Sequence, residues 1–153
     1  MNPIRRGAAW IYRVLIGLFA IAVVVQFFFA GAGVFGVDPD EGETFTQNQF
    51  EDKFELHSGL GGILMLASLL LFILILIAWT GPRSIGATFG LFVLMIIQQA
   101  LSAGDRWVGA FHPLNGLLIL GLSSFLARRA WRGNLLVPPS ELRRTAPPPA
   151  PAP

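Results

Sequence analysis

Residues 56–79 read LHSGLGGILMLASLLLFILILIAW and contain no charged side chain. A bilayer core of about 30 Å needs about 20 apolar residues in helical form, so this run is long enough to cross a membrane. The hydrocarbon interior offers the backbone no water, and the run must satisfy its own amide and carbonyl groups there. The stretch therefore predicts a transmembrane helix with a histidine near one end.

Three further apolar runs share this character, and the composition agrees with them. Of the 153 residues, 54% are hydrophobic and 13% are charged, which is about half of the roughly 25% charged residues that soluble domains carry. The absence of cysteine excludes disulfides and thiolate metal sites. We expect an all-α integral membrane protein, with spans at about residues 10–31, 47–79, 85–103 and 107–131.

These spans would form one transmembrane domain, residues 1–133, followed by a Pro/Ala-rich tail, residues 134–153. The tail ends in APPPAPAP and can bury almost nothing, so we expect it to be a disordered cytoplasmic segment. Proline favours the first turn of a helix and disfavours helical geometry in the residue before it. The helix of the last span would therefore begin either near Trp107 or at Pro113, with His112 at its cap in the second case. Thr46 and Gln49 fit a capping box for the second span.

Charged residues alternate between the two sides of the spans. Basic residues lie before the first span, between the second and third, and after the fourth, whereas acidic residues lie between the first and second. The positive-inside rule then places both termini in the cytoplasm, as in an up-down-up-down bundle of a bacterial inner (cytoplasmic) membrane. Arginines in these places indicate membrane topology and not nucleic-acid binding.

The only two histidines of the chain occupy matching places in the second and fourth spans. Each is followed four residues later by a glycine, as His57 is by Gly61 and His112 by Gly116. Positions i and i+4 share a helix face, so each imidazole would lie above a notch without a bulky side chain. A flat macrocycle such as haem needs both features.

Polar side chains gather in the outer half of the spans, at the depth of these histidines. They are Gln26, Gln98, Gln99 and Asn115. Ionisable residues within spans usually mark a ligand, an ion path or a relay, and no polar path continues to the inner face, which disfavours transport. Two neutral imidazoles suit axial ligation of haem b. We therefore predict His57 and His112 as metal ligands, with the amides and glycines around the cofactor.

Aromatic and basic residues near the outer ends complete the predicted site. Phe50 and Phe54 share a helical face with His57, and they would either roof a cofactor or pack against a neighbouring helix. Lys53 and Arg106 are the basic residues available on the outer side. We expect them to pair with haem propionates, unless they are ordinary loop charges.

Other interpretations of the histidines remain open. They would also suit structural residues that hydrogen-bond the amides, or ligands of another metal or a chlorophyll-type pigment. Zinc is poorly served, because its usual third and fourth ligands are missing. A non-redox subunit of a larger membrane complex is the rival function, and Gly86 and Gly90, spaced four apart, would allow close helix packing in it.

The His-x3-Gly turns of the second and fourth spans resemble one half of haem A synthase and, more loosely, other four-helix membrane cytochromes b. The chain also resembles a family of short bacterial four-span proteins of unknown function, in which Phe-x-x-His (here Phe54 to His57) opens the second helix. In that family His-Pro-x-Asn (here His112 to Asn115) opens the fourth. The resemblance to haem A synthase and the cytochromes implies that the two histidines ligate haem, whereas the second family, which resembles residues 8–130 more closely, implies no activity.

Haem A synthase has two such halves, and its catalytic half carries an acidic residue three positions before the second-helix histidine. That position is Phe54 here, and the nearby Glu55 lies on another helical face. The resemblance therefore implies single-haem binding and electron transfer, or an accessory role in a respiratory or photosynthetic complex, and not an enzyme acting alone. A quinone is a further expected partner, beside the lipid bilayer itself.

Overall fold

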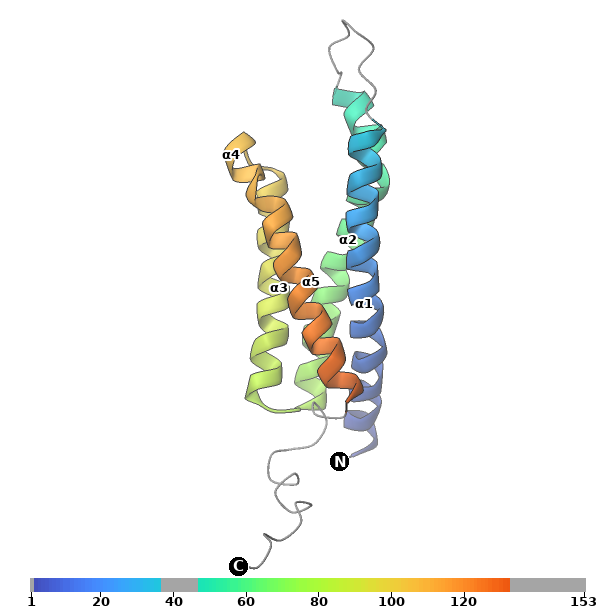
Figure 1. Ribbon diagram of the computed structural model, residues 1–153. Helices are drawn as coiled ribbons and strands as arrows, with labels where there is room; N and C mark the ends of the chain where they lie inside the picture. Colours follow the sequence, from blue (N-terminus) through green and yellow to red (C-terminus); the bar gives the residue numbers. More distant parts are fainter. Residues whose placement is uncertain (1, 37–46, 133–153) are drawn as a thin grey trace, which may run out of the picture.

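The computed structural model describes residues 2–36 and 47–132, and every regular element among them is an α-helix (Figure 1). The helices are α1 (Pro3–Phe35), α2 (Gln47–Ala78), α3 (Pro82–Ser102), α4 (Arg106–Gly109) and α5 (Phe111–Trp131). Four segments are long and apolar enough to cross a membrane, the last of them running from α4 through α5. The predicted all-α, multi-pass membrane bundle is confirmed, whereas the predicted tail and Thr46 lie outside the described residues.

Two helix starts can be compared with those that the sequence predicts. Helix α1 begins at Pro3 and not near residue 10, because the Asn2 side chain accepts a hydrogen bond from the Arg5 amide (3.2 Å) and a proline occupies the first turn. The last apolar segment runs from Arg106 to Trp131, which agrees with the expected start near Trp107, and α5 within it begins at Phe111. The alternative start at Pro113 is wrong, and His112 lies in the first turn of α5 instead of at its cap. A proline is tolerated in that turn because its missing N–H would have no intrahelical partner there.

Each long helix packs against two neighbours, in the order α1, α2, α3, α5 and back to α1, and the diagonal pairs are not in backbone contact. Helices α1 and α3 run in one direction and α2 and α5 in the other (Figure 1). The bundle therefore consists of two hairpins, α1–α2 and α3–α5, placed side by side. The N-terminus of α1 and the end of α5 lie at the same end of the bundle (Figure 1).

The two hairpins repeat one pattern of burial, with one sequence offset between α1 and α3 and another between α2 and α5. Positions buried in the first hairpin correspond to positions buried in the second: Tyr12 with Ser84, Ile16 with Thr88, Phe19 with Leu91, Val23 with Met95, Leu64 with Ile119, Ser68 with Ser123, Leu71 with Leu126, and Ile75 with Ala130. Even the serines match, because each donates its hydroxyl to the carbonyl three residues earlier. The hairpins are thus structural repeats about an axis along the bundle.

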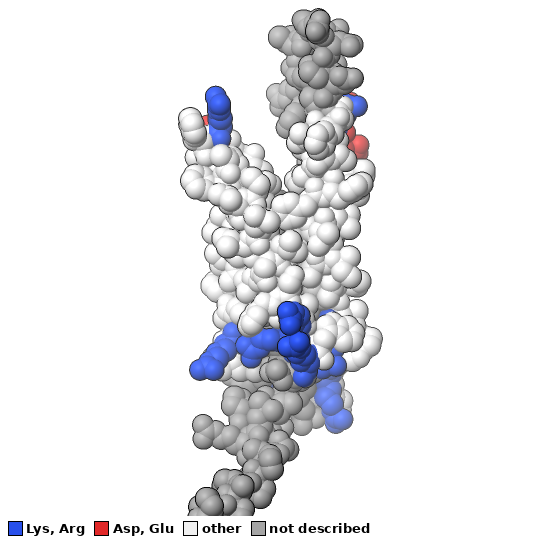
Figure 2. All heavy atoms as spheres, viewed as in Figure 1, with Lys and Arg blue, Asp and Glu red and all other residues white. Residues whose placement is uncertain are grey.

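Hydrogen bonds and a tight turn hold the hairpins at the end near the N-terminus. Thr88 donates its hydroxyl to the Ser84 carbonyl (3.0 Å), so the buried Tyr12 hydroxyl is the donor in its 2.8 Å bond to Thr88. Arg5 donates to the last carbonyls of α2, and the turn into α3 has Gly81 at φ 108°, where a side chain would strain the backbone. Most of the visible lysine and arginine atoms form a band at this end (Figure 2).

Candidate cofactor site

A cavity of about 250 Å³ lies between the two hairpins, in the half of the bundle away from the N-terminus. Figure 2 shows the molecule hollowed between the hairpins at that end. The lining residues are again matched pairs: Val23 with Met95, Gln26 with Gln98, Phe27 with Gln99, Ala30 with Ser102, His57 with His112, Ser58 with Pro113, Gly61 with Gly116, and Leu64 with Ile119. The cavity therefore lies on the axis that relates the two repeats.

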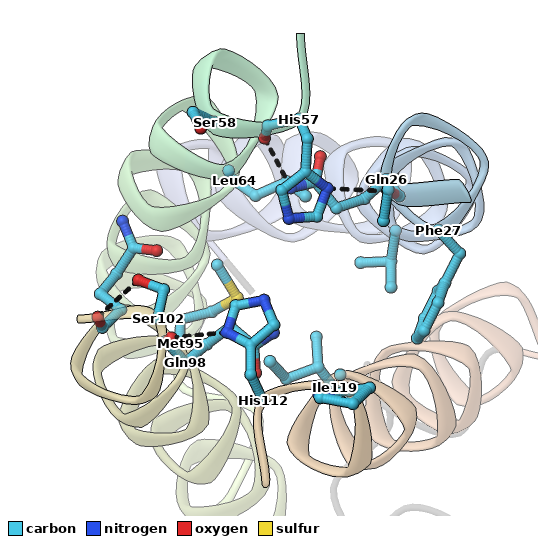
Figure 3. A pocket seen from close by; sticks show the side chains of 16 residues that line it. Gln26, Phe27, His57, Ser58, Leu64, Met95, Gln98, Ser102, His112 and Ile119 are labelled. Atoms are coloured by element: carbon cyan, nitrogen blue, oxygen red, sulfur yellow. Dashed lines mark hydrogen bonds between the residues drawn. The ribbon is translucent and has the colours of Figure 1, made fainter. Parts of the chain in front are cut away.

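The two histidines face each other across this cavity. Their ring centroids are 6.1 Å apart, and the ring planes are inclined at 57°. Figure 3 shows the rings pointing toward one another from α2 and α5, which are diagonal in the bundle. Two imidazoles that share one metal ion at about 2.0–2.1 Å per bond have their centroids roughly 6 Å apart, so this spacing would accept a metal ion between them.

Each histidine is oriented by a backbone carbonyl of the helix beside it in its own hairpin. His57 Nδ1 lies 3.1 Å from the Gln26 carbonyl oxygen, and His112 Nδ1 lies 3.1 Å from that of Gln98. A carbonyl only accepts hydrogen bonds, so both Nδ1 atoms donate and both Nε2 atoms keep a free lone pair. Metal-ligating histidines typically make this bond, which fixes the tautomer and the direction of the ring.

The two glutamines make different hydrogen bonds. Gln26 donates Nε2 to the His57 carbonyl (2.7 Å), and its side-chain oxygen is buried without a hydrogen-bond partner. The Gln98 side-chain oxygen accepts from Asn115 Nδ2 (2.7 Å), which also donates to the Leu94 carbonyl (2.9 Å). The oxygen of Gln98 is therefore satisfied by Asn115, whereas that of Gln26 is left as an acceptor.

The structure brings most of the predicted site residues to the cavity wall. Those that line it are Gln26, His57, Gly61, Gln98, Gln99, His112 and Gly116. Asn115 is buried behind Gln98 and acts on the cavity only through that side chain. Both glycines of the His-x3-Gly turns lie on the wall, but side chains of α1 occupy the expected notches, Gln26 at Gly61 and Phe27 at Gly116.

The predicted aromatic and basic residues lie away from the cavity wall. The Phe54 ring meets the edge of His57, with centroids 6.2 Å apart, and packs against Gly33 of α1. It supports the histidine from behind and does not roof the cavity. Lys53 and Arg106 are exposed and do not line the cavity, so the pairing with propionates stays a prediction. The Phe50 side chain lies outside the described part of the chain.

Apolar lining residues were missed by the sequence reasoning. The most prominent is Phe27, which comes directly after Gln26 and packs toward Gly116 (Figure 3). Met95, Leu64 and Ile119 form the floor, one helical turn or two below the polar residues. A usable signal existed for the three floor residues, because each lies three, four or seven residues from a predicted polar one. Phe27 has no such spacing, because it is adjacent to Gln26.

The protein supplies two metal-competent side chains here. Within the described ranges no group of three or more His, Cys, Asp or Glu side chains gathers in one place. Two nitrogens on opposite sides of a cavity suit a metal whose remaining ligands come from a cofactor, and they do not suit a bare tetrahedral ion. Comparison with known proteins adds no family, because no family model matches and neither the curated proteins nor the solved structures gave a significant match.

Proposed function

We propose that this protein binds one haem b between the two hairpins, with His57 and His112 as axial ligands. The observation that carries the proposal is the pair of imidazoles at 6.1 Å, each with its Nδ1 bonded to a carbonyl. That arrangement leaves two Nε2 lone pairs directed into one cavity, and a ferric or ferrous haem accepts two such nitrogens. A structural histidine needs neither a matched partner nor a free lone pair facing a cavity.

The cavity wall also suits the faces and edges of a macrocycle. Gly61 and Gly116 lie on the wall one helical turn from the two histidines, where the side chains of Gln26 and Phe27 pack against them. A macrocycle would contact these two side chains beside the imidazoles. Apolar side chains such as Leu64, Met95 and Ile119 close the floor and exclude water from that side. When bound, haem would supply a reversible one-electron couple, and the residues of this chain would hold and orient it.

The proposed role is electron transfer near one membrane surface, alone or within a larger redox complex. The cavity lies in one half of the bundle, and the other half is packed with apolar side chains around the Tyr12–Thr88 bond. A single haem in this position is too far from the opposite surface, across about 30 Å of hydrocarbon, to conduct electrons through the membrane by itself. By the positive-inside rule the band of basic residues is cytoplasmic, so the haem would face the outer side.

The test is the visible spectrum of the full-length protein purified in detergent. We expect one haem b per chain, with the spectrum of a six-coordinate, low-spin iron. The variants His57→Ala and His112→Ala should each lose that species, whereas Ser124→Ala on α5, whose residue is outside the cavity wall, should keep it. An unchanged low-spin spectrum in either histidine variant would refute the bis-histidine proposal.

A second candidate is a non-redox subunit that packs against another membrane protein. It is favoured by an apolar groove between α2 and α3 near the N-terminal end, lined by residues that include Trp79, Ile85 and Gly86. A Cβ added at Gly86 would meet no atom within 4 Å, whereas one at Gly90 would lie 3.9 Å from Leu122 of α5. Only Gly86 of the predicted pair is thus open. Co-purification with a partner complex and without haem would favour this candidate.

A further inference from the structure

The repeat of the two hairpins is broken at one place on the cavity wall. In the ring of helices, the gap between α1 and α5 corresponds to the gap between α3 and α2. Phe27 belongs to the first gap, and its counterpart in the second is Gln99. An aromatic ring fills its gap with apolar atoms, whereas an amide brings hydrogen-bonding atoms to the matching gap.

The gap between α1 and α5 is closed by Phe27. A Cβ built on Gly116 would lie 3.1 Å from Phe27 Cζ, so the ring covers the glycine at contact distance. The corresponding glycine in the other gap is Gly61, and a Cβ built there would lie 3.2 Å from Gln26 Nε2, so an amide and not an aromatic ring covers it. Gln99 of α3 and Ser58 of α2 line the cavity at this gap and are both exposed, so the cavity reaches the surface between α2 and α3.

This side opening has polar margins on both helices. Ser58 of α2 and Ser102 of α3 are exposed and lie at this side of the cavity, away from Phe27 (Figure 3). Ser102 donates its hydroxyl to the backbone carbonyl of Gln99 (2.8 Å), so this bond does not use the side-chain amide of Gln99. No lysine, arginine, aspartate or glutamate lines the cavity in the described part of the chain. The opening therefore suits a neutral ligand that makes hydrogen bonds.

We propose that the opening between α2 and α3 binds the ring of a membrane quinone or hydroquinone, hydrogen-bonded by Gln99 of α3 and Ser58 of α2. The ring is flat, neutral and lipophilic, and it carries oxygen atoms on opposite edges, which matches polar groups on both sides of the gap. A charged lipid headgroup would lack a counter-ion here. The binding site stands on this geometry, while its use in electron exchange rests on the proposed haem.

The test is equilibrium binding of a ubiquinone analogue with a short isoprenoid tail to the full-length protein in lipid nanodiscs, with empty nanodiscs as the blank. Gln99→Phe copies into the open gap the residue that closes the other one, and we expect it to weaken binding by about tenfold or more. Gln99→Leu removes the hydrogen bonds with less bulk, and we expect a smaller loss. Ser124→Ala should bind like the parent.

The reciprocal change separates a specific opening from general partitioning into the bilayer. Phe27→Gln should open the second gap and raise the amount of quinone bound per chain, because it uncovers Gly116. Each variant is first checked for a single folded species by size-exclusion chromatography and by its visible spectrum.

Quinone binding that Gln99→Phe leaves unchanged, or no binding above the blank, would overturn the proposal. The proposal would also be overturned if the protein bound no quinone and Gln99→Leu changed the haem spectrum or midpoint potential. That result would assign the opening to an edge of the haem. Quinone binding by a protein that carries no haem would support this site while refuting the proposed function. A normal haem spectrum without quinone binding would refute this site alone.

Discussion

Gly33 and Gly31 of α1 form a matched pair that tests how Phe54 supports His57. Gly33 is buried, and a Cβ added there would lie 2.9–3.0 Å from three atoms of the Phe54 ring, closer than packed carbon atoms approach. The ring would have to move, and with it the edge contact to His57. A Cβ added at Gly31, two residues earlier, would meet no atom within 4 Å.

The cost of displacing the Phe54 ring equals the difference in unfolding free energy between Gly33→Ala and Gly31→Ala. Replacing glycine by alanine where no contact opposes it stabilises a helix by about 0.4–1 kcal/mol, through the unfolded chain. Both variants share this contribution, so it cancels in the comparison. Forcing a methyl group into a packed contact costs about 1–3 kcal/mol. We therefore expect Gly33→Ala to be less stable than Gly31→Ala by about 1–3 kcal/mol.

The assay is reversible unfolding in mixed detergent micelles, with the fraction of SDS as the denaturing variable and helical circular dichroism as the signal. Gly31→Ala serves as the control and should unfold at the parent midpoint or slightly above it. Equal stability of the two variants would refute the reasoning, because it would mean that Phe54 does not pack on Gly33.

Three further predictions concern the bundle and its orientation. Tyr12→Phe should lower the free energy of unfolding by about 0.6 kcal/mol, and by no more than about 1.7, in the same assay. If the double variant Tyr12→Phe/Thr88→Val is no less stable than Thr88→Val alone, the hydrogen bond between the two side chains is confirmed. Asn115→Leu should cost about 1–3 kcal/mol because it leaves the Gln98 side-chain oxygen without its donor, and adding Gln98→Leu should recover part of that loss; a cost that stays the same would contradict the bond. A tag after residue 153 should be protected from a membrane-impermeant reagent in intact cells, and labelling there would overturn the topology.

Much of the fold was predictable because the membrane leaves few alternatives. Apolar length alone located the spans, and the spacing of His57 and Gly61 and of His112 and Gly116 placed both pairs correctly on the cavity wall. These predictions depend only on the period of a helix. They do not require knowledge of which helices touch.

The features that were missed depend on contacts between helices. Phe54 was correctly placed on the same helix face as His57. Its ring, however, packs away from the cavity against Gly33 of α1, a contact that helical periodicity does not reveal. Of the two expected starts of the last helix, the one at Pro113 was wrong, because proline also fits the third position of a helix, where its missing N–H has no intrahelical partner. The role of Phe27 needed the register between α1 and α5, which only tertiary packing fixes.

The repeat of the hairpins was also hidden in the sequence. Few of the matched residues are identical, since Tyr12 corresponds to Ser84 and Phe27 to Gln99. A lipid-facing or buried apolar position accepts many side chains of similar volume, so the repeat persists in position more than in residue type. Position and residue type agree at the two histidines and their glycines, and also at Gln26 with Gln98 and Ser68 with Ser123.

The most direct test of the central claim is chemical rescue of the missing ligand. His57→Gly and His112→Gly should each lose the six-coordinate, low-spin haem spectrum, and added imidazole should restore it by entering the space that the side chain left. Rescue in both variants is the result we predict, because each ring supplies one nitrogen from its own side of the cavity. A low-spin haem that persists in either variant before imidazole is added would contradict the account.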